Sequence, residues 1–445
     1  MFRLETRYYM KKHTIAIIGS GSAYTPGIVN ALLEQKEQIG IKKIVFIDND
    51  NERLHITGDF MKIMIEENDP DIEVLLTTDR KEGFHEMDFL LAQIRTGRLP
   101  QRVKDEKIAM RHGVIGQETC GPGGFAFAMR EIPAMVEIAK DVEKYAPNAW
   151  IINYSNPTGI VAEAIQREVP EAKNICICDV PPWLQSDMAK LMQGKPSDFT
   201  YRYFGLNHLG WFTNMFDEKG NDVLPLICDY VKDHGMYLGT ATDESWKQSA
   251  IRQKQFIRDF PGTLPVTYLQ YYYYPDQMFN AEDINYTRGQ YCIDHREKEI
   301  YDLCKKGIKN HTSKGNNLKD TIHGDFIVNI VNAIVNNTNE EFIINVPNNG
   351  IISNFSQGAI VECIARINAS GYQPLAVGEI PLFQKGLMEV MKAYEILTVE
   401  CNLEGSYQKA LEALTLNPIV PSTNVARELL NDYIEANKEY WPELK

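Results

Sequence analysis

The sequence predicts an α/β protein in which a doubly wound parallel sheet is followed by a second α/β or α+β domain. Three observations lead to this prediction. Short apolar, β-branched runs alternate with helical patterns from residue 14 to residue 178. A glycine-rich turn, GSGS at 19–22, directly follows the first of these runs. After about residue 180 the pattern becomes mixed and contains an aromatic-rich stretch, YLQYYYYPD at 268–276.

Six short apolar runs are expected to form the strands of the parallel sheet, because they are rich in β-branched residues and alternate with helical patterns. They cover residues 14–18, 42–48, 72–78, 88–94, 149–155 and 174–178. Helices are expected over about 51–67, from the glycine-rich stretch 116–124 to about 145, near 320–337 and over 384–414. We therefore predict domains of residues 12–180 and 181–445 that pack tightly, with the site at their junction.

Length and composition fit a cytosolic protein of two domains. The 445 residues are 44% apolar and 24% charged, and no apolar run reaches the ~18 residues that a membrane span needs. The formal net charge of −14 opposes binding to nucleic acid or to an anionic membrane. Residues 1–13 lack the apolar core of a secretory signal. We expect a cytoplasmic protein with no disulfides and with neither nucleic acid nor membrane as partner.

The turn after the first predicted strand is typical of a dinucleotide site. Gly19, Gly21 and Ser22 precede a helical pattern, and a tight turn at a helix N-terminus suits a pyrophosphate. Asp48 ends the second predicted strand, where a carboxylate binds ribose hydroxyls and disfavours a 2′-phosphate. Tyr24 replaces the third glycine of the usual fingerprint, so a purely structural turn is the alternative. The prediction is a Rossmann-like domain that binds NAD rather than NADP.

Polar side chains follow the later predicted strands as well. Arg95 and Arg102 come after the fourth run, and arginine forks suit phosphate, although a solvated basic loop is the common alternative. Asn156 lies in NYSNP, where the following proline favours an extended backbone that points the amide outward, or simply a turn. The glycines of 116–124 let backbone N–H groups face a ligand, with the carboxylate of Glu118 nearby, or they lead into a helix.

Two further patterns contain potential metal ligands. Cys178 stands beside Asp179 after a predicted buried strand, and His208 lies in FGLNHLGW. A thiolate binds metals, but a lone cysteine or histidine is more often part of a core. An incomplete ligand pair would leave open positions for substrate oxygens. Cys176 shares a strand face with Cys178 and is either a competing ligand or core. Spacing alone does not predict a metal.

Taken together, these segments resemble glycoside hydrolase family 4. The matching motifs are GSGSAYTPG, IRTGR, HGVIGQETCGPGG, INYSNP, CDVP, GLNH, TYLQYY, YTR, NNGIISNF and the C-terminal WPEL, which together span nearly the whole chain. Within the family the chain looks most similar to members that cleave 6-phosphorylated α-glucosides such as maltose 6′-phosphate. In those members an aspartate follows the metal-binding cysteine, as Asp179 follows Cys178, whereas β-acting relatives tend to carry asparagine.

The resemblance implies NAD and a divalent metal, usually Mn²⁺, and roles for individual residues. Cys178 and His208 would hold the metal. Tyr268, with Tyr271 as its nearest rival, would be the base, its pKa lowered by the metal and by cationic side chains. Asp179 would be the acid, which requires a buried setting. The remaining assignments are substrate contacts at Arg95, Arg102, Asn156 and Arg288 and NAD contacts at Gly19, Gly21, Ser22 and Asp48.

The implied reaction departs from the usual pair of carboxylates. Oxidation at sugar C3 makes the C2 proton acidic, a base removes it while the metal stabilises the charge, and the leaving oxygen departs from C1 by elimination. Arg288 is the best candidate for binding the 6-phosphate, with Arg95 also possible. The second domain would carry the substrate, metal and subunit contacts of a homodimer or homotetramer.

Three alternatives stay open at this point. An NAD-dependent dehydrogenase of the 2-hydroxy acid type would explain the N-terminal domain but not the cysteine, histidine and tyrosine motifs. A non-catalytic NAD-binding sensor of sugar phosphates would bind ligand without hydrolysis. Within the family, a 6-phospho-β-glucosidase, an α-galactosidase or an α-galacturonidase would share the motifs and differ in substrate.

Overall fold

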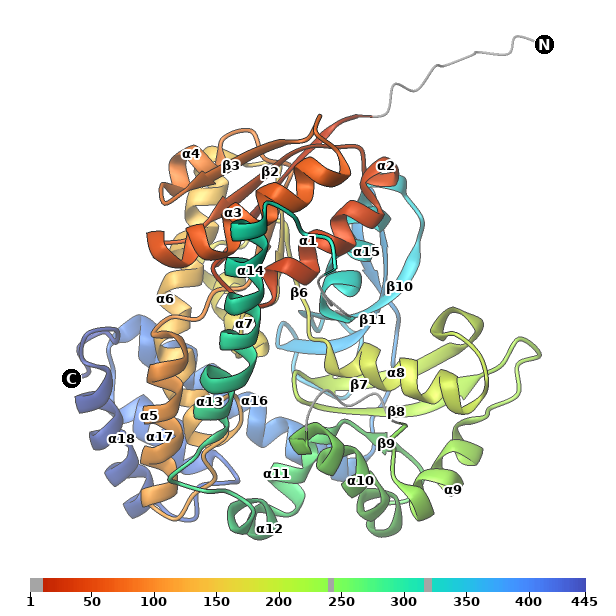
Figure 1. Ribbon diagram of the computed structural model, residues 1–445. Helices are drawn as coiled ribbons and strands as arrows, with labels where there is room; N and C mark the ends of the chain where they lie inside the picture. The colour runs from red at the N-terminus through yellow and green to blue at the C-terminus, as the bar shows by residue number, and fades with distance from the viewer. Residues whose placement is uncertain (1–10, 239–243, 316–321) are drawn as a thin grey trace.

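The computed structural model describes residues 11–238, 244–315 and 322–445 (Figure 1). Most of the N-terminal segment in which we find no secretory signal, and the start of the helix predicted near 320–337, lie outside these ranges. The twelve strands of the described chain form one sheet, in the order β3-β2-β1-β4-β5-β6-β10-β11-β7-β8-β9, with β12 paired to β11.

The first six strands of this order are parallel, as the sequence predicts. The order 3-2-1-4-5-6 is that of a Rossmann sheet, so the predicted fold class is confirmed. The strand predicted over 174–178 ends earlier, at Cys176, because the chain leaves the sheet there. The parallel strands are β1 (His13–Ile18), β2 (Ile41–Ile47), β3 (Glu73–Thr77), β4 (Phe89–Ala92), β5 (Trp150–Asn153) and β6 (Asn174–Cys176).

The other six strands extend the same sheet in antiparallel fashion. The seam between the two halves is the pair Asn345↔Cys176, which joins β10 to β6. The sheet therefore continues across the predicted domain boundary at residue 180, and that boundary stays a prediction. The antiparallel strands are β7 (Thr200–Leu206), β8 (Leu209–Phe216), β9 (Leu264–Pro265), β10 (Glu340–Pro347), β11 (Ile360–Asn368) and β12 (Gly371–Pro374).

Helices cover both faces of the parallel half. α1 (Thr25–Glu34) and α3 (Asn51–Asn68) form one layer, where α15 (Ile322–Asn336) packs on α1 and α14 (Lys298–Asn310) lies beside α3 (Figure 1). α6 (Gly121–Tyr145) and α7 (Thr158–Glu168) pack together, and α16 (Leu382–Glu404) packs on both. The C-terminal chain thus completes the helical layers of the N-terminal sheet.

The remaining helices are α2 (Lys36–Ile39), α4 (Arg80–Phe84), α5 (Arg98–Arg111), α8 (Val180–Leu191), α9 (Leu224–His234), α10 (Glu244–Asp259), α11 (Gln270–Tyr273), α12 (Pro275–Asn280), α13 (Arg288–Tyr291), α17 (Tyr407–Leu416) and α18 (Thr423–Asn437). Of these, α2 precedes β2 and packs on α15, and α4 packs on α6 beside β2 and β3, while the others lie in the lower part of the view (Figure 1). Among the described residues, none of the helices is both long and apolar enough to cross a bilayer. All eight cysteines are free and buried.

The glycine-rich stretch 116–124 leads into a helix, which is one of the two alternatives that the sequence left open. Its last glycines form the first turn of α6, and the loop before them folds back on that turn. A Cβ at Gly123 would lie 2.2 Å from the carbonyl oxygen of Gln117, and one at Gly124 would lie 2.2 Å from that of Thr119. Gly123 and Gly124 are therefore required for close packing of the loop that carries Glu118, and a role of this loop in binding a ligand stays a prediction.

Candidate active site

One cleft of about 1810 Å³ lies at the carboxyl ends of the parallel strands and at the tip of the β7–β8 hairpin. Ligand pockets commonly measure roughly 300–1,000 Å³, so this cleft has room for a dinucleotide beside a substrate. Open α/β sheets bind ligands at this edge, where the strand order reverses between β1 and β4. Ten predicted site residues line it: Gly19, Ser22, Asp48, Arg95, Arg102, Asn156, Asp179, His208, Tyr268 and Arg288.

The turn after β1 forms a tight cradle at one end of the cleft. Gly19 has φ +76°, and a Cβ there would lie 2.8 Å from the carbonyl oxygen of Gln93. A Cβ at Gly21 would lie 2.7 Å from the Cβ of Arg53, while the N–H of Gly21 donates to Oδ2 of Asp48 at 2.8 Å. Only glycine fits at these two positions. A compact turn before a helix with a carboxylate at its side fits a dinucleotide.

Cys178 and Asp179 lie just past the end of β6. The Cys178 thiol is buried, and its sulfur is 3.8 Å from Oδ1 of Asp179. Burial, then the charges of Asp179 and Glu362, raise the pKa of Cys178 well above its usual range. Asp179 is hydrogen-bonded to Tyr154 and is partly exposed to the cleft, whereas the sequence led us to expect a buried acid. A bound substrate would complete its burial.

Cys176 occupies a different environment from Cys178. It packs in a small cluster with Ala162 and Ile360. Its sulfur accepts hydrogen bonds from the amides of Asn153, at 3.4 Å, and Asn174, at 3.2 Å. These contacts favour the core alternative for Cys176 and leave Cys178 as the thiol beside the cleft.

His208 occupies the tip of a two-residue turn, Asn207-His208, between β7 and β8. Its φ of +63° is uncommon for a residue with a side chain, and such strain is concentrated at functional sites. Burial lowers the pKa of His208 to about 4, so the imidazole is neutral at physiological pH. Nδ1 of His208 lies 3.1 Å from Oγ1 of Thr119, which leaves Nε2 for a ligand.

Tyr268 stacks on His208, with ring centroids 4.0 Å apart and planes 6° apart. Burial raises the pKa of Tyr268 well above its usual value, and the nearby Glu118, Tyr271 and Cys178 raise it further. The net shift in the protein alone is therefore upward, opposite to the lowering that the resemblance implies for the complex with a metal. Tyr271 also lines the cleft, 6.0 Å from Tyr268 between ring centroids. The stacked contact with His208 favours Tyr268 over its rival.

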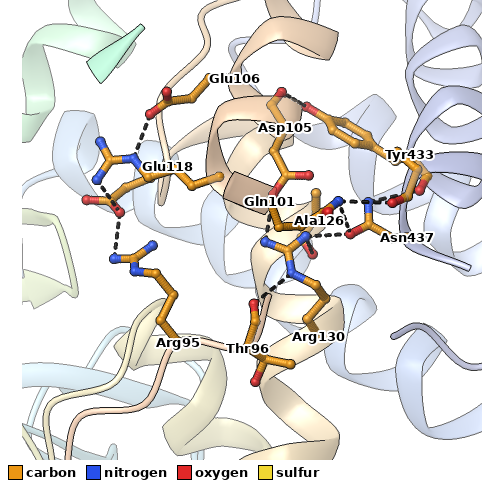
Figure 2. A network of polar contacts seen from close by, with 12 residues as sticks. Arg95, Thr96, Gln101, Asp105, Glu106, Glu118, Ala126, Arg130, Tyr433 and Asn437 are labelled. Atoms are coloured by element: carbon orange, nitrogen blue, oxygen red, sulfur yellow. Dashed lines mark hydrogen bonds and ion pairs between the residues drawn. The ribbon is translucent and has the colours of Figure 1, made fainter. Parts of the chain in front are cut away.

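Arg95 and Arg102 converge on a single carboxylate, that of Glu118; Figure 2 shows the contact between Arg95 and Glu118. Nη2 of Arg95 and Nη1 of Arg102 lie 2.7 Å and 2.8 Å from Oε2 of Glu118, and Nε of Arg102 donates to Glu106 at 2.7 Å. Burial alone would raise the pKa of Glu118, but the two guanidinium groups hold it at about 2. Two acidic partners therefore balance the two arginines.

Arg288 reaches the cleft from α13, which packs on α5. Its guanidinium carbon lies 4.7 Å from the ring centroid of Tyr291. The N–H of the next residue, Gly289, donates to Oε2 of Glu106 at 2.8 Å. The same buried carboxylate thus contacts Arg102 and the backbone beside Arg288, which brings these predicted substrate contacts together.

The buried carboxyl group of Glu131, which contacts the loop after Arg95, should make the stability of the protein depend on pH. Glu131 is fully buried and accepts the N–H of Thr96 at 2.9 Å, and burial raises its pKa from 4.5 to about 7. The folded protein therefore holds a proton that the unfolded chain loses between pH 4.5 and 7, so this group lowers stability as pH rises through that window. We expect Glu131→Gln to remove this loss. Its melting temperature minus that of wild type should increase by ~2 °C or more from pH 5 to pH 8 in scanning calorimetry.

The matched control for Glu131 is Glu143→Gln, an exposed position on the same helix. It should show no such trend with pH. A difference between Glu131→Gln and wild type that stays constant from pH 5 to pH 8 would contradict the assignment of this titration to Glu131.

Several site residues have no assigned role in the sequence interpretation. Thr119 bonds His208, Asn207 is hydrogen-bonded to the Cys178 thiol, and Tyr154 partners Asp179. Each is an immediate neighbour of a motif residue, in ETC, GLNH and NYS. Membership of those motifs was the available signal, but the contacts themselves join segments far apart in the chain.

The donor set fits a divalent cation with open coordination positions. Cys178 supplies a thiol that needs a nearby positive charge to ionise, and His208 supplies a neutral imidazole. Tyr268 stacks on His208 in the cleft and interacts electrostatically with Cys178, so the three side chains lie in one region of the protein, with Cys178 buried beside the cleft. In the described part of the chain no group of three or more His, Cys, Asp and Glu side chains forms a metal cluster by itself. Substrate oxygens would complete such a site.

Family models match both halves of the chain. Residues 14–194 match the family 4 glycosyl hydrolases, and residues 203–420 match the C-terminal domain of the same family. The chain is 46% identical to the phospho-alpha-glucosidase PagL of Clostridium acetobutylicum, over 98% of this chain and 100% of that protein.

Crystal structures of relatives have the same fold. A 6-phospho-alpha-glucosidase from gut microorganisms, in complex with NAD and Mn²⁺, is 39% identical with a TM-score of 0.95. A 6-phospho-alpha-glucosidase from gut microorganisms in complex with NAD and glucose-6-phosphate is 41% identical with a TM-score of 0.94. Each alignment covers 98% of this chain and 100% of the relative. The chain belongs to family 4 of the glycosyl hydrolases.

Proposed function

We propose that the chain hydrolyses 6-phosphorylated α-glucosides such as maltose 6′-phosphate, with NAD and Mn²⁺ as cofactors. The observation that carries this proposal is the meeting of Asp179, His208 and Tyr268 in the cleft that also contains the glycine turn after β1, with the buried thiol of Cys178 directly beside Asp179. The names of the relatives support the phosphorylated α-glucoside, and their bound NAD, Mn²⁺ and glucose-6-phosphate support the cofactors and the phosphate.

The cofactors would occupy adjoining parts of the cleft. When bound, NAD supplies reversible oxidation at sugar C3, and the metal supplies positive charge beside the C2 and C3 oxygens. Cys178 and His208 would hold the metal. The NAD contacts would be Gly19, Gly21, Ser22 and Asp48.

Two side chains would move protons. Tyr268 takes the C2 proton on its phenolic oxygen, and stacking on His208 fixes the direction of its ring. Burial raises the pKa of Tyr268. The positive charge of a metal held by Cys178 and His208 would lower that pKa again. Asp179 donates a proton to the leaving oxygen, and its hydrogen bond with Tyr154 orients the carboxyl group.

The substrate contacts would be Arg95, Arg102, Asn156 and Arg288. Arg95 and Arg102 already share Glu118, so the charge around them is balanced within the protein. We assign the 6-phosphate to Arg288, which reaches the cleft from α13 next to Arg102, and polar contacts with the sugar to the others. Their placement along the same cleft supports this division.

The decisive assay compares p-nitrophenyl α- and β-glucoside 6-phosphates, with and without Mn²⁺ and NAD⁺. We expect release of p-nitrophenol from the α isomer only when both cofactors are present. Cleavage in the presence of a chelator, or after removal of the dinucleotide, would refute the mechanism. Preference for the β isomer, or for the unphosphorylated glucoside, would refute the substrate.

We further propose a homodimer or homotetramer that works in the cytoplasm. Residues 12–180 would hold the dinucleotide, and residues 181–445 would supply the substrate, metal and subunit contacts. Leu382 and Phe383, at the start of α16, are 84% and 52% exposed. Large exposed apolar side chains of this kind support a subunit contact on this face.

A further inference from the structure

We propose that Trp183 and Trp246 form the subsite that holds the leaving group, which in a disaccharide 6-phosphate is the second, unphosphorylated sugar ring. This subsite rests on the proposed function and adds to it the part of the cleft that would decide which leaving groups are accepted. Both indole side chains line the cleft and are partly exposed.

The position of Trp183 follows from helix α8. Asp179 directly precedes this helix, and the N–H of Trp183 donates to the carbonyl oxygen of Asp179 at 3.0 Å. Trp183, Ser186 and Lys190 follow Asp179 at helical spacing, and all four line the cleft. One face of α8 therefore leads away from the proposed acid. An acid must lie within hydrogen-bond reach of the leaving oxygen, so the leaving group lies beside this face.

The position of Trp246 follows from helix α10. Ser245, Trp246 and Ser249 line the cleft from that helix. The ring of Trp246 meets that of Trp183 edge to face, with centroids 5.6 Å apart. It also meets the ring of Tyr268 edge to face, at 6.0 Å. The two tryptophans thus lie next to the proposed base, Tyr268, and the proposed acid, Asp179, and come from helices α8 and α10.

The chemistry of this region suits a neutral sugar. Indole rings cover the C–H face of a pyranose, and the hydroxyl groups of Ser186 and Ser245 suit hydrogen bonds with its hydroxyls. The ammonium of Lys190 lies 3.6 Å from a carboxylate oxygen of Asp187, so its charge is paired. These features favour a glucosyl or aryl leaving group over an anionic one.

The test compares maltose 6′-phosphate with methyl α-glucoside 6-phosphate, whose methyl group is too small to reach the tryptophans. For each variant we measure the ratio of kcat/KM for the disaccharide to kcat/KM for the methyl glycoside, in enzyme loaded with NAD⁺ and Mn²⁺. We expect Trp183→Ala and Trp246→Ala each to lower this ratio by ~10-fold or more, and the Phe variants, which keep an aromatic ring, by about threefold or less.

A second measurement guards against a general defect of folding. D-glucose, the product that leaves this subsite, should inhibit cleavage of maltose 6′-phosphate competitively in wild type and ~10-fold more weakly in Trp246→Ala. The control is Lys247→Ala on the same helix, where the lysine lies over Tyr237, 5.6 Å from its ring centroid. Its ratio and its inhibition by glucose should equal those of wild type.

The outcomes separate the subsite from the function on which it rests. If both tryptophan variants keep the wild-type ratio of kcat/KM values, the subsite is overturned while the function stands. An equal loss of activity on both substrates keeps that ratio unchanged and therefore counts as the same outcome. A wild-type enzyme that cleaves neither substrate would overturn the proposed function and the subsite with it.

Discussion

Cys178→Ser is expected to abolish metal binding and turnover together. A serine hydroxyl does not ionise at neutral pH, so the variant loses the thiolate that we propose as one of two protein ligands. A metal acting as a Lewis acid contributes several kcal/mol to transition-state stabilisation, so we expect kcat to fall by at least ~10³-fold. Equilibrium dialysis should show loss of Mn²⁺ binding, while NAD⁺ binding in a fluorescence titration stays within a few-fold of wild type.

Cys176→Ser is the matched control for this experiment. The two cysteines lie close in sequence, but the sulfur of Cys176 is committed to the amides of Asn153 and Asn174 in the core. This variant should retain Mn²⁺ binding, with at most a loss of thermal stability. Retained Mn²⁺ binding in Cys178→Ser, or selective loss of it in Cys176→Ser, would refute the assignment of the ligand.

Tyr268→Phe is expected to lower kcat while leaving both cofactors bound. The variant keeps the ring that stacks on His208 and meets Trp246, and removes only the hydroxyl that we propose as the base. General-base catalysis is typically worth 10²–10⁴-fold, so kcat should fall by about that factor with KM within a few-fold of wild type. Release of deuterium from C2 of labelled substrate into water should slow in the same proportion, as NMR can measure.

Two other tyrosines of the aromatic stretch sharpen this test. Tyr273→Phe removes a hydroxyl that accepts a hydrogen bond from Trp211 at 3.3 Å and should keep nearly full activity. Tyr271→Phe tests the rival that also lines the cleft. If Tyr271→Phe abolishes release of C2 deuterium and Tyr268→Phe does not, the base has been assigned to the wrong tyrosine.

Local patterns predicted the parallel half of the sheet because its strands are short apolar runs buried between two helical layers. The run 14–18 became β1 and the run 42–48 became β2, with ends shifted by a residue or so. The antiparallel half gave no comparable signal. Its attachment depends on the pair Asn345↔Cys176, and a pairing across so long a stretch of chain has no local pattern.

The family motifs predicted which residues belong to the candidate site, but they did not predict which of those residues contact one another. The cleft contains ten of the predicted residues, but their partners are long-range. The ion pair between Arg102 and Glu118, and the contact of Thr119 with His208, become visible only once the loop before α6 is folded back. The same holds for the direction of the Tyr268 pKa, which burial and nearby acidic groups raise.

The seam between β6 and β10 has a consequence for how the metal site tolerates change elsewhere. Cys178 lies just past the end of β6, the last parallel strand. His208 lies in the turn of the β7–β8 hairpin, and in the sheet β10 and β11 separate β7 from β6. The side-chain amide of Asn345, on β10, connects the neighbouring strands by donating hydrogen bonds to the carbonyl oxygen of Cys176 on β6 and to the carboxylate of Glu362 on β11. The spacing of the two proposed ligands is thus set by the lateral alignment of the strands. A small shift in that alignment would weaken binding of the proposed metal while leaving both of its side-chain ligands in place.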